Sequence, residues 1–265
     1  MPFLNFDNAQ IYYEVAGHGT PFVMLHAGIA HNAMWDPQFD HFAKTHRVVR
    51  YDQRGFGKTT TTTKEFNRRA DLRALFDHLN IEHAIVMGCS MGGGLALDFA
   101  LEYPERVAAL ILIAPGVSGY QPSAEILKQE EEMDAAFSAG DNERGIEMEI
   151  RYWVDGPKRA PNQVDAAVRE KVRAMERENL QINTEGYNSL RLTPPAIGRL
   201  RDIHAPTLII QGDGDVSNHV ELSQQLAHEI PNAELFEMAN VGHLPSMEKP
   251  DEVNRIVEKF LTQIA

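Results

Sequence analysis

Ser90 is the residue most able to do chemistry, because it stands in a G-x-S-x-G pattern at residues 88–92. The pattern follows an apolar run at 84–87 and opens a helical pattern at 92–102, which is the strand–turn–helix setting of a nucleophile elbow. Strand and helix pass close together at such a turn, so the flanking glycines supply room that side chains would fill. We predict that Ser90 is a nucleophile whose hydroxyl attacks a carbonyl carbon.

A glycine-rich connection after a strand can instead bind phosphate at the amino end of the next helix. The segment has neither the G-x-x-x-x-G-K of a P-loop nor the G-x-G-x-x-G of a dinucleotide fold, so the nucleophile interpretation is favoured. Cys89, the single cysteine of the chain, precedes the serine. We expect its side chain to pack sideways as a small buried apolar group.

A serine nucleophile needs a base, and the base needs a carboxylate that orients it. The apolar run at 207–210 leads into a loop that holds Asp213 and Asp215. The carboxyl ends of parallel strands meet at one sheet edge, where Ser90 is also expected. Both aspartates are candidates, and we favour Asp215 because it lies further past the strand and reaches further toward a base.

The chain has 11 histidines, and most of them must be solvated or packed in the core. His204 precedes a strand and so belongs to the opposite edge of the sheet, whereas His219 begins a predicted helix. His243 lies beside a glycine in a loop that follows the last predicted strand, 233–237. We therefore predict that His243 is the base.

The charge that develops on the attacked carbonyl oxygen needs two backbone N–H donors. At a nucleophile elbow one donor belongs to the residue after the nucleophile, here Met91. The second comes from the loop after an earlier strand, here residues 26–29.

These loops need a β-sheet that brings them to one of its edges. The rest of the chain has the sequence patterns of such a sheet. Short apolar runs bounded by turn residues indicate strands buried on both faces; with an early strand at 10–15, they lie at 21–25, 47–51, 84–87, 108–113 and 207–210. Helical patterns lie between or after the strands, at 70–79, 92–102, 217–228 and 251–262. This alternation predicts an α/β fold with a mostly parallel, doubly wound sheet.

Residues 117–195 break the alternation, because strand-like runs give way to three helical patterns at 125–137, 142–154 and 164–180. We predict a core domain of residues 1–116 and 196–265, and a helical cap, or lid, of residues 117–195. The cap is inserted after the sixth strand and lies over the carboxyl edge of the sheet. The alternative is an independent helical domain, for which three helices are few.

Aromatic residues and methionines in and near the cap could line an apolar substrate pocket, although such residues at helical spacing more often form the core of the cap. The candidates are Trp35, Met133, Met148, Tyr152, Trp153 and Met175. A substrate with a carboxylate would need an arginine there, for which Arg144, Arg151 and Arg159 are candidates. Solvated surface is the alternative that we favour for each arginine.

Composition narrows the class of protein. The chain is 43% hydrophobic and 24% charged, as ordinary globular proteins are, and its net charge of −13 opposes binding to nucleic acid or to an anionic membrane. One cysteine cannot form an internal disulfide and fits a reducing compartment. The first residues, 1–7, lack the features of a signal peptide, and no apolar stretch is long enough to span a membrane. These observations predict a cytoplasmic protein.

Taken together, the motifs resemble those of the α/β-hydrolase superfamily over nearly the whole chain, in the branch of small esterases, enol-lactonases, perhydrolases and carbon–carbon bond hydrolases. The matching segments are 25–28 (Leu-His-Ala-Gly), 51–57 (Tyr-Asp-Gln-Arg-Gly-Phe-Gly), 88–93, 212–215 and 242–245 (Gly-His-Leu-Pro), with Glu248 and Pro250 completing the ending. Members typically have glycine where this chain has Ala27. A serine at position 90 differs from the aspartate of the dehalogenase and epoxide-hydrolase branches.

The resemblance implies particular roles. It supports Asp215 over Asp213, and it implies that Gly28 carries the second oxyanion donor. Asp52 and Arg54 are implied to be structural, holding the loop beneath the active site. Proline iminopeptidases share the motif around these two residues but usually have tryptophan after the serine.

The expected reaction is hydrolysis of a small carboxylic ester or lactone by a Ser-His-Asp triad of Ser90, His243 and Asp215, through an acyl-enzyme. The sequence has no H-E-x-x-H or similar ligand spacing, so no metal or organic cofactor is expected. The alternatives are a carbon–carbon bond hydrolase of the same fold and a receptor-like protein that binds a ligand with slow turnover or none. The sequence leaves the substrate and the oligomeric state open.

Overall fold

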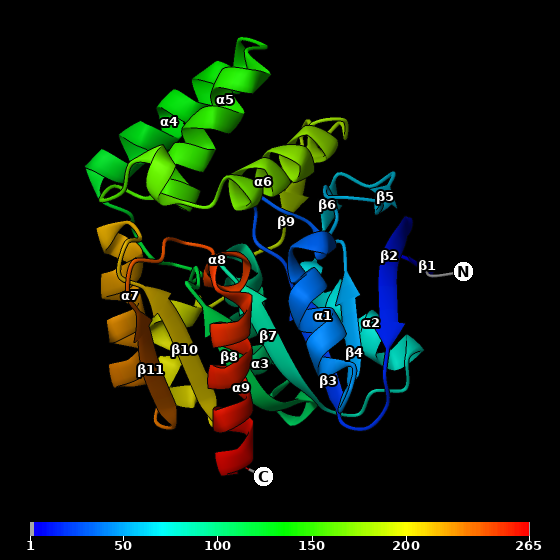
Figure 1. Cartoon of the computed structure of the whole chain (residues 1–265). Coiled ribbons are helices and arrows are strands. Elements are labelled where there is room, and N and C mark those ends of the chain that lie inside the picture. Colours follow the sequence, from blue (N-terminus) through cyan, green and yellow to red (C-terminus); the bar gives the residue numbers. More distant parts are fainter. Residues whose placement is uncertain (1–2, 265) are drawn as a thin grey trace.

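The computed structural model describes residues 3–264, so residues 1–2 and 265 of the predicted core lie outside the described residues. Within that range the main sheet has nine strands, eight of them in the order β1-β2-β4-β3-β7-β8-β10-β11, while β5 pairs with β2 (Figure 1). Their bounds are β1 Phe3–Phe6, β2 Ala9–Ala16, β3 Pro21–Leu25, β4 Arg47–Tyr51, β5 Thr60–Thr61, β7 Ala84–Cys89, β8 Val107–Ile113, β10 Thr207–Gly212 and β11 Ala233–Met238. Along this order, the neighbours β4, β3, β7, β8, β10 and β11 pair in parallel. The pairs of β2 with β1, β4 and β5 are antiparallel.

The central strands are parallel because helices cover both faces of the sheet. Along β3, Phe22 and Met24 pack into one hydrophobic cluster, while Val23 and Leu25 pack into the other. This alternation is what a pleated strand buried on both faces requires. The first cluster includes residues of α1 (Asp36–Phe42) and α9 (Pro250–Ile264); the second includes residues of α2 (Arg68–His78), α3 (Met91–Glu102) and α7 (Ser217–Glu229). The doubly wound α/β prediction is therefore confirmed.

The helices of the predicted cap follow β8, which is the sixth strand in chain order along the eight-strand path. They are α4 (Ala124–Ser138), α5 (Asn142–Glu149), the π-helix η3 (Ile150–Asp155), the short 3₁₀-helix η4 (Pro161–Gln163) and α6 (Ala166–Asn179). They lie above the upper end of the sheet in Figure 1. Buried cap residues such as Ile150 and Val172 belong to the same hydrophobic cluster as Met24 of the sheet. These helices and the sheet therefore share one hydrophobic cluster.

The structure differs from the sequence expectations at several elements. The helix expected at 142–154 is two elements, because α5 ends at Glu149 and the chain continues as a π-helix. Strand β1 and helix α1 were not expected, since β1 is four residues long and α1 has Pro37 in its first turn. The remaining short elements are β6 Glu65–Phe66, β9 Asn188–Ser189, α8 Pro245–Glu248 and the 3₁₀-helices η1 Asn32–Trp35, η2 Pro104–Arg106, η5 Ala196–Gly198 and η6 Leu200–Asp202. In residues 3–264, no helix is long and apolar enough to cross a membrane.

Arg54 and Asp52 hold the loop after β4, as the resemblance implied. The Arg54 guanidinium is buried and donates two hydrogen bonds to Asp71, from Nε at 2.9 Å and from Nη2 at 2.6 Å. Asp52 accepts from the backbone N–H of Asn32 at 2.9 Å and of Lys58 at 2.8 Å. The bond from Asn32 ties the loop to the segment just past residues 26–29, and the bonds to Asp71 tie it to α2.

Candidate active site

Ser90 stands alone between β7 and α3, in a backbone conformation of φ 51° and ψ −114°. A positive φ is strained for any residue with a Cβ, and such strain persists only where surrounding contacts hold it. The Ser90 N–H donates to the Ile113 carbonyl at 2.9 Å, and its carbonyl accepts from Gly94 at 3.0 Å and Gly116 at 2.9 Å. This is the geometry of the predicted nucleophile elbow.

The glycines around Ser90 are required by close backbone approach. A Cβ on Gly88 would lie 2.2 Å from the Gly92 carbonyl oxygen, and one on Gly92 would lie 2.2 Å from the Leu25 carbonyl oxygen. Cys89 is fully buried, and burial raises the pKa of its thiol. The prediction that Cys89 is an inert packing group agrees with this environment.

His243 and Asp215 form a buried pair. His243 Nδ1 lies 2.8 Å from Asp215 Oδ2, and both residues are about 1% exposed. Asp215 also accepts from Gln211 Nε2 at 2.9 Å and from the Val216 N–H at 2.7 Å. Burial acts to raise the pKa of the Asp215 carboxyl, but the charge and hydrogen bond of His243 and the Gln211 amide outweigh it, so this pKa lies below its usual value. Asp215 is thus held as a carboxylate.

The imidazole of His243 is fixed from several sides. Its backbone N–H donates to the Trp153 carbonyl at 3.1 Å. Its ring lies 4.6 Å from the Trp153 ring and 4.5 Å from the His219 ring, between centroids. The other ring nitrogen, Nε2, is buried and has no hydrogen-bond partner among residues 3–264. The Ser90 hydroxyl is therefore not hydrogen-bonded to this nitrogen in the structure.

The loop at 26–29 lies against the start of α3. A Cβ built on Gly28 would be 3.8 Å from the Met91 Cβ, so the two predicted oxyanion donors belong to neighbouring residues. Ala27, where family members have glycine, is fully buried, and its N–H donates to Met34 Sδ at 3.2 Å.

His26 holds this loop through both ring nitrogens. The Gln53 N–H donates to Nε2 at 3.0 Å, which leaves Nδ1 to donate to the Ala27 carbonyl at 2.8 Å. The ring is therefore neutral, and burial lowers the pKa of His26 from 6.5 to about 3.

We expect this histidine to make the protein less stable in acid. Between pH 6.5 and about 3 the unfolded chain binds a proton at His26 that the folded chain excludes, so the free energy of unfolding falls as pH falls through this window. In His26→Asn the slope below pH 6.5 should be shallower by up to about 1.4 kcal/mol per pH unit. Urea unfolding of both proteins from pH 8 to 4.5 measures this. Equal slopes would contradict the assignment of a neutral buried imidazole.

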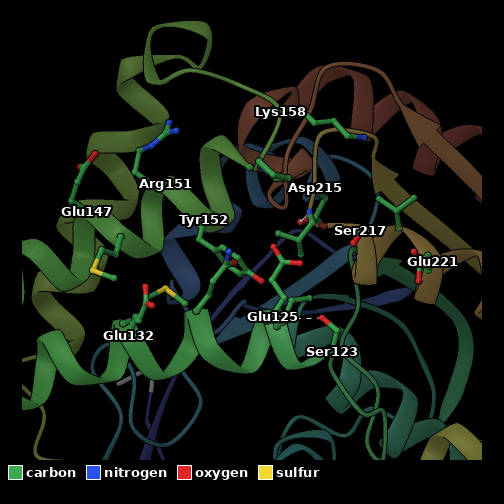
Figure 2. Close-up of a pocket in the computed structure, with 18 residues that line it drawn as sticks. Ser123, Glu125, Glu132, Glu147, Arg151, Tyr152, Lys158, Asp215, Ser217 and Glu221 are labelled. Atoms are coloured by element: carbon green, nitrogen blue, oxygen red, sulfur yellow. Dashed lines mark hydrogen bonds between the residues drawn. The ribbon is translucent and has the colours of Figure 1, made fainter.

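A cavity of about 570 Å³ lies between the cap helices and the amino end of α7 (Figure 2). Its apolar lining includes Ile126, Met133, Met148, Tyr152, Val216 and Val220. Figure 2 shows Glu125, Tyr152 and Asp215 near its centre, and Arg151 and Glu147 farther out on the cap. Ser90 and His243 do not line it, so it adjoins the site on the side of Asp215.

A smaller cavity of about 50 Å³ shares Ile126 and Val216 with the larger one and is also lined by Trp153 and His219. Both of those rings contact the ring of His243, so the smaller cavity lies next to that histidine.

The candidate pocket residues separate into three groups. Met133, Met148 and Tyr152 line the large cavity, and Trp153 lies against His243. Trp35 and Met175 belong to the hydrophobic core.

The three candidate arginines, all expected at the solvated surface, lie in different environments. Arg144 is exposed, as expected. Arg151 lines the cavity but pairs with Asp155. Surface solvation was wrong for Arg159, which is 8% exposed and pairs with Glu248 through Nη1 at 2.6 Å. Glu248 in turn accepts from the N–H of Gly242 at 2.7 Å, so this pair supports the turn before His243.

Sequence reasoning missed the place of His219 beside the site, because its position at the start of a predicted helix counted against it. The structure places it beside His243, partly buried, with 4.5 Å between the ring centroids. It also missed Gln211 and Ser223, where Ser223 Oγ donates to Gln211 Oε1 at 2.7 Å and so orients the amide that bonds Asp215. The spacing of His219 four residues after Asp215, across the first turn of a helix, is the one signal that could have indicated it.

Comparison with known protein families agrees with this fold. Residues 20–250 match the alpha/beta hydrolase fold family, so the chain belongs to that family. Its relatives include 2-hydroxy-6-oxo-6-phenylhexa-2,4-dienoate hydrolase of Comamonas testosteroni, 28% identical over 96% of this chain and 91% of the relative. Carboxylesterase YbfK of Bacillus subtilis (strain 168) is 26% identical over 90% of this chain and 79% of its own length. Among solved structures, Est816, described as an N-acyl homoserine lactone degrading enzyme, has a TM-score of 0.77 and 26% identity, covering 98% of this chain and 100% of its own. The chain is thus a hydrolase of a family that includes esterases, lactonases and carbon–carbon bond hydrolases.

Proposed function

We propose that this hydrolase cleaves small carboxylic esters or lactones with a triad of Ser90, His243 and Asp215. Two observations together carry the proposal. Ser90 is held at a strained elbow, and the His243–Asp215 pair leaves Nε2 of the imidazole without a hydrogen-bond partner among the described residues. A serine, a base and an oriented carboxylate are the parts that nucleophilic acyl transfer needs.

The reaction has two steps. Ser90 Oγ attacks the carbonyl carbon while its proton passes to His243 Nε2; that proton then goes to the leaving alcohol as the carbon–oxygen bond breaks. Water next attacks the acyl-enzyme, with Nε2 again taking a proton, and the acid is released from Ser90. Asp215 keeps the Nδ1–H tautomer and stabilises the imidazolium that forms in each step.

The N–H groups of Gly28 and Met91 are proposed as the oxyanion donors. Support comes from the short separation of these residues and from the amino end of α3, whose first N–H groups have no partner within the helix. Because both donors are backbone groups, the rate of hydrolysis should depend on the conformation of the loop at 26–29 as much as on the side chains of the triad.

The cavity favours uncharged substrates. Glu125 and Glu221 line it and form no ion pair within residues 3–264, whereas Arg151 is already paired with Asp155. A substrate carboxylate would meet like charge from these glutamates. The other cation of the lining, Lys158, donates from Nζ to the Asp213 backbone carbonyl at 2.7 Å. Apolar lining and a volume of about 570 Å³ suit a small ester or lactone.

A carbon–carbon bond hydrolase is the second candidate, because a relative that matches most of the chain is named as a dienoate hydrolase. The charge of the cavity supports the ester or lactone candidate over this one. A receptor-like role without turnover is the third, and the strained elbow with its buried base supports an enzyme instead.

A substrate panel separates these candidates. We expect an uncharged p-nitrophenyl ester and a simple lactone to be hydrolysed, with a kcat/KM at least tenfold above that of a matched ester bearing a free carboxylate. A vinylogous 1,5-diketone carboxylate tests carbon–carbon cleavage. Faster turnover of this diketone than of any ester would reverse the order of the two enzyme candidates, and no turnover of any member would support the receptor-like role.

We also propose the division into a core of residues 1–116 and 196–265 and a cap of residues 117–195. The helices between β8 and β10 support it. The single buried cysteine supports a cytoplasmic location.

A further inference from the structure

His219 brings a third ligand-type side chain to the site. Asp215, His219 and His243 each offer one metal-ligand atom, and these atoms lie within 4.8 Å of one another. The His219 ring stands edge-on to the His243 ring, at 70° and 4.5 Å between centroids. The proposed hydrolysis uses Asp215 and His243 and assigns His219 no role.

The histidines present unused nitrogens. Nδ1 of His219 and Nε2 of His243 are buried, and neither has a hydrogen-bond partner among residues 3–264. Buried polar atoms are nearly always paired, so the orphaned Nδ1 of His219 calls for an explanation that the proposed role of His243 Nε2 as the base does not give. Neutral imidazole and carboxylate are the forms that bind metal ions.

We propose that Asp215, His219 and His243 bind one divalent transition-metal ion such as Zn²⁺, and that this binding switches the hydrolase off. Two imidazoles and a carboxylate form a ligand set suited to Zn²⁺. The binding part stands on the cluster itself. The inhibitory part rests on the proposed function, because it requires His243 to be the base.

The geometry indicates where the ion would sit. His243 Nδ1 and Asp215 Oδ2 are 2.8 Å apart across their hydrogen bond. Because ligand–metal distances are about 2.0–2.2 Å, both side chains must turn so that the ion lies beside this line and not on it. His219 must move by on the order of 1 Å to complete the set. Its Nδ1 has no partner to leave, although the ring also bonds the Pro115 backbone. Gln211 and the Val216 N–H orient the carboxylate, as outer-shell partners of metal ligands do.

The inhibition follows from a change in the position of the ring proton of His243. The ion takes the place of the Nδ1 proton, so the Nδ1–H bond breaks, a bond from Nδ1 to the metal forms, and the proton moves to Nε2. The ring stays neutral. With Nε2 protonated, His243 cannot accept the proton of Ser90, and acyl transfer stops.

Calorimetric titration of the metal-free full chain with Zn²⁺ tests the site without reference to activity. We expect one ion per chain, and an affinity at least tenfold weaker in His219→Phe and in His219→Gln. His41→Phe is the matched control, because it removes a surface histidine that bonds Glu258 at 2.8 Å and lies outside the cluster. Thermal unfolding confirms that each variant is folded. No stoichiometric binding, or equal binding by wild type and both His219 variants, would overturn the site.

Ester hydrolysis then tests the switch. We expect Zn²⁺ to inhibit the wild type and His41→Phe at the concentrations that titrate the site, and the His219 variants to keep most of their own zinc-free rate. Stoichiometric binding without inhibition would overturn the switch and retain the site. A chain that binds Zn²⁺ but hydrolyses nothing without the metal would contradict the proposed function instead.

Discussion

Replacing Ser90 with alanine is expected to lower kcat/KM for an uncharged p-nitrophenyl ester by at least about a thousandfold. The hydroxyl is the atom that forms the acyl-enzyme, and no neighbour can replace it. Cys89 is fully buried, with a raised thiol pKa that keeps it protonated. The residual rate should reflect water attacking a carbonyl held by the Gly28 and Met91 N–H groups.

Steady-state kinetics on purified variants measure this effect. Ser138→Ala is the control, since Ser138 is exposed at the end of α4 and should keep wild-type activity. Alanine at position 90 retains the positive φ, so thermal unfolding should show a folded variant. A Ser90→Ala protein within about threefold of wild type would remove Ser90 from the mechanism.

Asp215→Asn is expected to lower kcat by about 10⁴-fold, the scale of losing the correct histidine tautomer in a serine triad. Both carboxylate oxygens accept hydrogen bonds: Oδ1 from the Val216 N–H, and Oδ2 from Gln211 and His243. An asparagine must point its NH₂ group at one of these donor sets. It therefore either loses the bond to Val216 or forces His243 into the tautomer with its proton on Nε2.

Asp213→Asn is the matched control in the same loop. Asp213 is exposed, and its Oδ1 accepts from the Asn240 N–H at 2.7 Å rather than from a histidine. We expect it to keep kcat within about threefold of wild type. A large loss in Asp213→Asn with a small loss in Asp215→Asn would reverse the assignment of the acid.

Most of the sheet could be predicted because its strands are buried on both faces and so appear as short apolar runs. The run at 84–87 lies within β7, and the run at 207–210 lies within β10. The edge strand β1 and the π-helix after Glu149 could not, because neither has a local pattern that separates it from a loop or from an α-helix.

The site residues could be predicted where their order in the chain and their position after a strand determine where they lie. Asp215 and His243 follow β10 and β11, and the structure brings them to hydrogen-bonding distance. The role of Ser90 stays a prediction, supported by its elbow. Contacts that join distant segments were beyond the sequence, since the Arg159–Glu248 pair spans 89 residues. The approach of His219 to His243 likewise depends on how the loop after Asp215 enters α7.

The central claim is that Ser90 is an activated nucleophile, and labelling with a fluorophosphonate tests it most directly. The account predicts one adduct per chain, found by peptide mass spectrometry on Ser90, with labelling slowed at least a hundredfold in Asp215→Asn and abolished in Ser90→Ala. Labelling at another residue, or no labelling of a folded chain, would contradict it.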